Sequence, residues 1–122
     1  MAEYNLAANP ASQSCRLIDF KKAEVRPGII PDTWFLIVSG EKPCINMEVS
    51  LVPLVYVRCP DYWGIEVVGC LPQGICLPAI GEYVVAIPLA GITGSEGIEV
   101  IGANRSEKIR VRGGCKPVTA SA

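Results

Sequence analysis

Cysteine is the residue type with the most chemical potential in this chain, because its 122 residues include six cysteines and no histidine. Without histidine, neither a Ser-His-Asp nor a Cys-His nucleophile system can be assembled, and imidazole metal sites are excluded. The cysteines are Cys15, Cys44, Cys59, Cys70, Cys76 and Cys115. No two of them have the Cys-x-x-Cys spacing, so neither a zinc knuckle nor a thioredoxin-type redox motif is supported.

The sequence leaves the redox state of these cysteines open. An even number of cysteines predicts disulfides in a secreted chain. The first residues, Met1-Ala2-Glu3, lead into a polar stretch without the basic and apolar regions of a signal peptide. We therefore expect a cytoplasmic protein with reduced, buried cysteines, a virion being the second location considered.

If a disulfide does form, Cys70 and Cys76 are the closest pair along the chain. The loop between them contains Pro72 and Gly74 and could fold back to bring the two thiols together. A bridge between the cysteines near the two chain ends is a second alternative. A third use is a thiolate site for Cu(I) or Zn(II), built from Cys59 and the closest pair.

Two carboxylates occupy matching positions of an internal repeat. Residues 64–69 read Gly-Ile-Glu-Val-Val-Gly, and residues 97–102 read Gly-Ile-Glu-Val-Ile-Gly. If both segments lie in one sheet, Glu66 and Glu99 could work as a pair. The simpler interpretation is that they are the solvent-facing residues of two alternating strands. We accordingly expect no enzymatic activity, no catalytic residues, and no cofactor or metal.

The elements that position these residues are predicted to be strands, because apolar and polar residues alternate between turns rich in glycine and proline. The expected strands are 15–25, 33–39, 45–58, 63–69, 82–89, 97–103 and 106–112. Seven or eight short strands indicate an all-β fold, a single antiparallel β-sandwich of immunoglobulin-like or jelly-roll-like type. The domain would span 15–114, between an extended N-terminal arm, 1–14, and a C-terminal tail, 115–122.

Local chemistry refines three of these strands. Lys21 and Lys22 interrupt the first strand as a bulge would. Pro53 removes a ladder donor, so the chain should bend or change sheets there. Residues 54–58 and 63–69 are predicted to form a hairpin around a Pro-Asp turn. The residues expected in the core are Phe20, Trp34, Phe35, Ile37, Met47, Val49, Ile65, Val67, Tyr83, Val85, Ile87, Ile98, Val100 and Ile109.

Composition favours an interaction protein. Half of the residues are hydrophobic, only 19% are charged, and the mean hydropathy is +0.35. A small β domain cannot hide all of this apolar material, and exposed apolar patches mark partner surfaces. We expect a non-enzymatic structural or protein-interaction module that self-assembles or joins a larger assembly, such as a virion or phage decoration protein or a shell or filament subunit.

The expected partner is protein, with the chain forming a homo-oligomer. A net charge of −1 gives no reason to expect nucleic acid or a membrane surface as a partner. Two sets of residues are candidates for the contact. Tyr4, Leu6 and Pro10 would anchor the N-terminal arm on a neighbour. Tyr62 with Trp63 would contact a partner if exposed, or would plug one end of the sandwich if folded inward.

Overall fold

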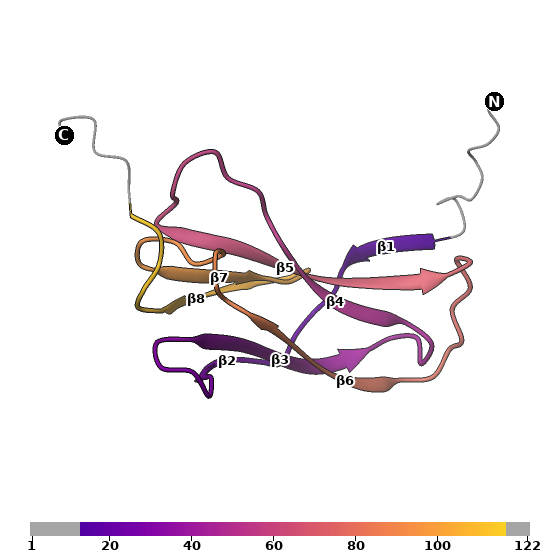
Figure 1. Cartoon of the computed structure of the whole chain (residues 1–122). Helices are drawn as coiled ribbons and strands as arrows, with labels where there is room; N and C mark the ends of the chain where they lie inside the picture. The colour runs from indigo at the N-terminus through magenta and orange to yellow at the C-terminus, as the bar shows by residue number, and fades with distance from the viewer. Residues whose placement is uncertain (1–12, 117–122) are drawn as a thin grey trace, which may run out of the picture.

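The computed structural model describes residues 13–116, which form eight strands arranged in two sheets (Figure 1). No residue of this range lies in a helix, so the prediction of an all-β fold is confirmed. The strands are β1 (Gln13–Leu17), β2 (Lys22–Pro27), β3 (Trp34–Lys42), β4 (Glu48–Pro53), β5 (Tyr62–Pro72), β6 (Gly81–Pro88), β7 (Gly97–Ile101) and β8 (Ser106–Arg110).

The larger sheet is organised around β5, which has 11 residues. Its strand order is β1-β5-β7-β8, and β4 also pairs with β5. Residues 65–66 pair with both β4 and β7, and residues 68–70 pair with both β4 and β1. Strand β4 therefore lies on one side of β5, while β7 and β1 follow one another along the other side.

The two repeated segments are neighbours in this sheet. They lie in β5 and β7, which pair in parallel, whereas every other strand pair between residues 13 and 116 is antiparallel. The expectation of a wholly antiparallel fold is therefore wrong at this pair. The register aligns Ile65 with Val100, which offsets the repeats by two residues and keeps the same faces inward.

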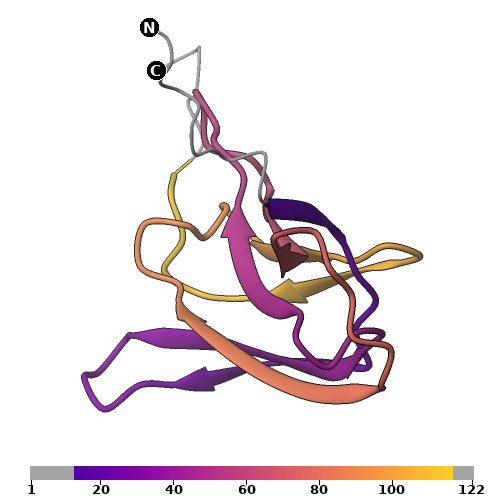
Figure 2. The same ribbon diagram turned by 90° about the vertical axis from the view of Figure 1, so that its right-hand side faces the viewer.

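The smaller sheet has the order β2-β3-β6 and forms the layer drawn below the larger sheet in Figures 1 and 2. The side chains that are completely buried come from both sheets. They are Leu36 and Val38 of the smaller sheet and Ile65, Val67, Ile98 and Val100 of the larger sheet. Burying an aliphatic side chain of this size stabilises the folded state by about 1.5–3 kcal/mol, so this shared core holds the two sheets together.

The first predicted strand, 15–25, is two strands in different sheets. The chain leaves the larger sheet after Leu17 and joins the smaller one at Lys22. At the crossing, the Ile18 amide donates to the Val67 carbonyl at 3.0 Å and the Lys21 amide donates to the Ser39 carbonyl at 2.9 Å. The expected bulge at the two lysines is therefore the end of a crossover between the sheets.

The hairpin predicted for 54–58 and 63–69 is also wrong. Strand β4 ends at Pro53 and pairs with β5, and residues 54–61 form the loop that joins them. Two valines of this loop, Val55 and Val57, are fully solvent-exposed. The apolar run 54–57 resembles a strand in composition, but its last backbone hydrogen bond to β5 is the one that the Leu54 amide donates to the Gly64 carbonyl at 2.9 Å.

The predicted core is largely confirmed, with one error of register in β3. Among the expected residues, Phe35 is 38% exposed, whereas its neighbour Leu36 is completely buried. The run Trp34–Val38 is apolar without alternation, so its composition does not specify which face points inward. Ile37 shares the outer face of β3 with Phe35 and is half-buried, so it too was assigned to the wrong face. The remaining expected residues are buried or packed against the core.

Three disulfides connect residues that lie far apart along the chain. They join Cys15 to Cys70, Cys44 to Cys76, and Cys59 to Cys115. The predicted Cys70–Cys76 bridge is wrong because β5 continues to Pro72, and Cys70 lies directly opposite Cys15 in the β1–β5 ladder. The expectation of reduced cysteines is likewise not met, since all six are paired.

Candidate interaction surface

The two aromatic residues at the start of β5 contact other residues of this domain. The indole Nε1 of Trp63 donates a 2.9 Å hydrogen bond to the Leu54 carbonyl, and its ring meets Tyr56 edge-on at a centroid distance of 5.0 Å. Tyr62 lies on the opposite face of the strand, where the ammonium group of Lys108 is 5.1 Å from its ring centroid. The two side chains therefore point to opposite faces, and Trp63 anchors the 54–61 loop.

The arm residues Tyr4, Leu6 and Pro10 lie outside the described residues, so their anchoring role stays a prediction. The described chain begins in β1, where Gln13 is aligned with Pro72 of β5. Residues 13 and 14, which the sequence placed in the arm, are therefore part of the larger sheet.

Glu66 and Glu99 share the outer face of the larger sheet but are not directly opposite each other. Glu66 is aligned with Ile101, and Glu99 with Gly64. The carboxylate of Glu99 accepts a 2.9 Å hydrogen bond from the Ser106 hydroxyl on β8. The arrangement therefore gives two separately placed, half-buried carboxylates on one strand pair, consistent with the solvent-facing interpretation.

The thiolate alternative loses its ligands in this structure. The three cysteines considered for it, Cys59, Cys70 and Cys76, belong to three different disulfides. A sulfur in a disulfide carries no thiolate charge, and metal binding by cysteine requires the thiolate. Such a site would therefore require all three bonds to be broken.

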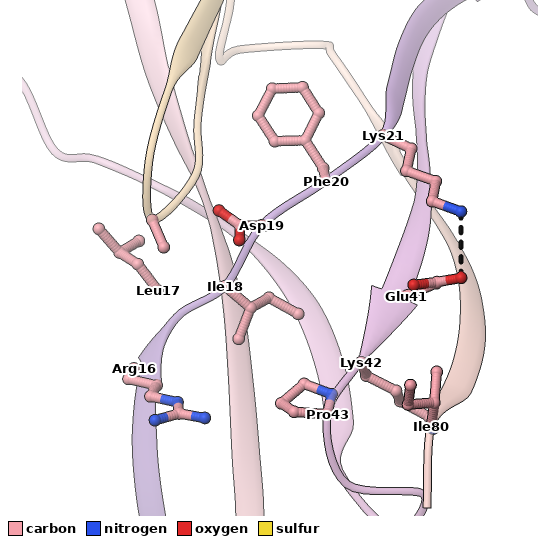
Figure 3. A pocket seen from close by; sticks show the side chains of 11 residues that line it. Arg16, Leu17, Ile18, Asp19, Phe20, Lys21, Glu41, Lys42, Pro43 and Ile80 are labelled. Atoms are coloured by element: carbon pink, nitrogen blue, oxygen red, sulfur yellow. Dashed lines mark hydrogen bonds and ion pairs between the residues drawn. The ribbon is translucent and has the colours of Figure 1, made fainter.

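A cavity of about 560 Å³ lies beside the crossover between the sheets (Figure 3). On its rim, the Lys21 ammonium and the Glu41 carboxylate form a 3.1 Å ion pair. The Asn104 amide donates to both oxygens of Asp19, at 2.8 and 3.0 Å. These charged groups interact with residues from other parts of the chain. The rim therefore joins the crossover segment to its neighbouring elements, and we call it the junction.

Arg105 closes this junction from the turn after β7. Its guanidinium carbon lies 4.0 Å from the centroid of the Phe20 ring, and Nη2 donates to the carbonyls of Phe20 and Lys21. The hydroxyl of Tyr83 on β6 donates to the Asp19 carbonyl at 2.8 Å. Burial, and secondarily the charge of the Asp19 carboxylate, raise the pKa of Tyr83 to about 12.

Apolar side chains are exposed on two loops that a disulfide joins. The Cys44–Cys76 bond connects the β3–β4 turn to the 73–80 loop. Asn46 reinforces this bond, because its side chain donates to the Ile75 carbonyl at 2.7 Å and accepts from the Leu77 amide at 3.0 Å. The exposed side chains on these two loops are Ile45, Ile75, Leu77 and Ile80, which we call the stapled apolar patch.

The stapled apolar patch continues onto the smaller sheet. Ile45 lies over Gly81, the first residue of β6, where an added Cβ atom would meet its Cδ1 atom at 2.7 Å. Ile80 directly precedes β6, and Val84 in the middle of this strand is 72% exposed. Exposed apolar side chains therefore stand on the joined loops and in the middle of β6, with the exposed Glu82 between Ile80 and Val84. Sequence composition alone indicated exposed apolar side chains without locating them.

A second cavity, of about 340 Å³, lies at the far end of the smaller sheet. Trp34, Phe35 and Leu89 contribute to its lining, and the exposed side chains of Ile29 and Ile30 on the β2–β3 loop lie at its border. Its composition is mainly apolar, which adds to the exposed apolar surface of the molecule.

Comparisons with protein-family models, with curated proteins and with solved structures found no match to this chain. Within residues 13–116, no helix has the length and apolar character needed to cross a membrane.

Proposed function

We propose that this chain is a non-enzymatic structural or protein-interaction module that associates with copies of itself. The observation that carries the proposal is the apolar surface formed by the stapled apolar patch and Val84. Several large aliphatic side chains exposed on one region of a small protein are typical of a surface that binds a partner. Holding them on loops joined by a disulfide reduces the entropy lost on association, which favours a binding role.

The frame of this module is a β-sandwich of immunoglobulin-like or jelly-roll-like type. The support for this assignment is that the buried side chains of both sheets belong to one core. A rigid two-layer frame with loops at both ends is a common way to present contact surfaces to other proteins.

The six paired cysteines favour a site of action outside a reducing cytosol, contrary to the cytoplasmic expectation. Disulfides form and persist in oxidising surroundings, which include secreted space and the surfaces of virions. A decoration protein of a virion or phage, or a subunit of an extracellular shell or filament, fits both the disulfides and the apolar surface.

A protein partner is favoured over nucleic acid or an anionic membrane. Two of the basic residues near the C-terminus form ion pairs with nearby acids: Arg110 lies 3.3 Å from Glu96, and Arg105 lies 3.1 Å from Glu107. With this local neutralisation and a net charge of −1, no strong electrostatic attraction to phosphate groups is expected.

Analytical ultracentrifugation of the oxidised full chain over a wide concentration range tests self-association. We expect a species larger than the 13.0 kDa monomer, with a mass that falls on dilution. A monomer at every concentration would contradict the proposal.

A further inference from the structure

Strand β6 is an open edge of the smaller sheet (Figures 1 and 2). Its ladder partner is β3, and among residues 13–116 no other backbone hydrogen bond reaches it. The Leu89 amide, just after the strand, donates to the Trp34 carbonyl of β3. Because main-chain groups alternate in direction along an antiparallel ladder, the amides of Glu82, Val84 and Ala86 point away from β3.

Strand β6 carries fewer charged residues than the edge strands β2 and β8. Strand β2 carries Lys22, Glu24 and Arg26, and β8 carries Glu107, Lys108 and Arg110. Charged residues, lysine above all, discourage pairing between edge strands of different molecules. Strand β6 has eight residues and one charged side chain, Glu82. It therefore lacks the protection that β2 and β8 carry.

The exposed side chains of β6 from Val84 onward are apolar. Val84 and Ala86 are exposed, and Ala86 is aligned with the half-buried Ile37 of β3 on the same face. Glu82 separates this row from Ile80 on the same face of the strand. A partner that extends the sheet would therefore gain main-chain hydrogen bonds and cover apolar side chains at once.

We propose that β6 pairs in an antiparallel manner with β6 of a second copy, about a two-fold axis at Val84. The inference rests on the self-association proposed above and assigns its surface. In this register the two Val84 residues exchange main-chain hydrogen bonds, and Glu82 of each copy lies opposite Ala86 of the other. All three outward amides are used, and the two Glu82 carboxylates are kept apart. The smaller sheets of the two copies become one continuous sheet.

Val84→Lys tests the pairing in the oxidised full chain. Two lysines would face each other at the axis, and the exposed position of the side chain allows the fold to remain. We expect the dissociation constant of the dimer to rise at least tenfold, about 1.4 kcal/mol. Ser50→Lys places the same charge on β4, an open edge of the larger sheet, at an exposed side chain. This control variant should keep the wild-type mass, and circular dichroism should show both variants folded.

Hydrogen exchange of the wild-type protein gives a second readout that needs no variant. The amides of Val84 and Ala86 should exchange more slowly as the protein concentration rises. Ladder alternation also turns the amides of Ala23 and Val25 outward from β2, because the Gly28 amide of this hairpin donates to Thr33. Those two amides should exchange at a rate independent of concentration.

Other outcomes distinguish this inference from the proposed function. If Ser50→Lys dissociates the protein and Val84→Lys does not, the edge in use is β4 and the β6 pairing is wrong. If removal of residues 1–12 dissociates it while Val84→Lys does not, the N-terminal arm is the bridge, which also overturns the β6 pairing. Both results leave self-association standing. A monomeric wild-type protein overturns both proposals.

Discussion

The hydroxyl of Tyr83 donates a 2.8 Å hydrogen bond to the main-chain carbonyl of Asp19, linking β6 to the segment that crosses between the sheets. Tyr83 is 6% exposed, so the bond is shielded from water. Removing the hydroxyl leaves a carbonyl without its donor, and we expect Tyr83→Phe to lower the free energy of unfolding by about 1 kcal/mol at neutral pH. Urea unfolding measures this difference, and an unchanged midpoint would contradict it.

Burial of the same hydroxyl predicts a loss of stability in alkaline solution. The pKa of Tyr83 is raised from 10.0 to about 12 by folding, so its neutral form is favoured in the folded state. This contribution is complete below pH 10, the value for the unfolded chain, and is lost as the pH rises towards 12. The slope from this group is at most about 1.4 kcal/mol per pH unit. Urea unfolding across this range should show a shallower decline for Tyr83→Phe than for the wild-type protein.

The register of β3 predicts unequal effects at neighbouring positions. Leu36 is completely buried and Phe35 is 38% exposed. Leu36→Ala removes core packing and leaves a cavity, so it should cost about 2–5 kcal/mol. Phe35→Ala should cost less despite its larger side chain, because part of the ring is already in contact with water. A larger loss for Phe35→Ala in chemical denaturation would place the wrong face of β3 in the core.

Gly97 at the start of β7 allows the chain to lie close to β8. A Cβ atom at this position would overlap the carbonyl oxygen of Ile109 and lie 2.8 Å from the Cα atom of Arg110. Backbone atoms cannot move aside as a flexible side chain can, so Gly97→Ala should cost more than about 3 kcal/mol. Gly91→Ala is the control: its φ of 79° is unfavourable for alanine, but no atom lies within 4 Å. It should cost about 1 kcal/mol, and thermal unfolding can compare the two variants.

The disulfide pairing can be read from non-reduced peptide maps. We expect fragments that join Cys15 to Cys70, Cys44 to Cys76, and Cys59 to Cys115. Reduction should lower the free energy of unfolding by about 2–5 kcal/mol for each bond, because the unfolded chain regains the entropy that the bonds remove. Free thiols in the unfolded, unreduced protein, or a Cys70–Cys76 fragment, would contradict this pairing.

Sequence patterns identified the strands wherever alternation coincided with one exposed face. In the last strand, Lys108 and Arg110 face solvent while Ile109 points inward, as their alternation predicts. The repeated segments were likewise recognised as strands. Their parallel pairing with a shift of two residues was not predictable. Pairing with a different strand, or with a different even shift, would bury the same face of each segment.

The errors occur where local composition and long-range contacts disagree. Residues 15–25 alternate well enough for one strand, but Ile18 and Phe20 are buried at the crossover between two sheets. The cysteine spacing favoured the nearest pair, whereas strand pairing places Cys15 opposite Cys70. Neither contact is encoded in local sequence. For the same reason, exposed apolar side chains could be expected from composition but not placed on particular loops or strands.

The connectivity of the three disulfides has a consequence for how this protein is made. The three bonds close the loops 15–70, 44–76 and 59–115, with sequence separations of 55, 32 and 56 residues. Each loop overlaps the other two. As the chain emerges from the ribosome, Cys15 meets Cys44 and then Cys59 before Cys70 exists, so the earliest available pairs are non-native. The native set is one of many complete pairings that six cysteines allow. Production in quantity therefore depends on thiol–disulfide exchange, and an isomerase with a balanced redox buffer should determine the yield.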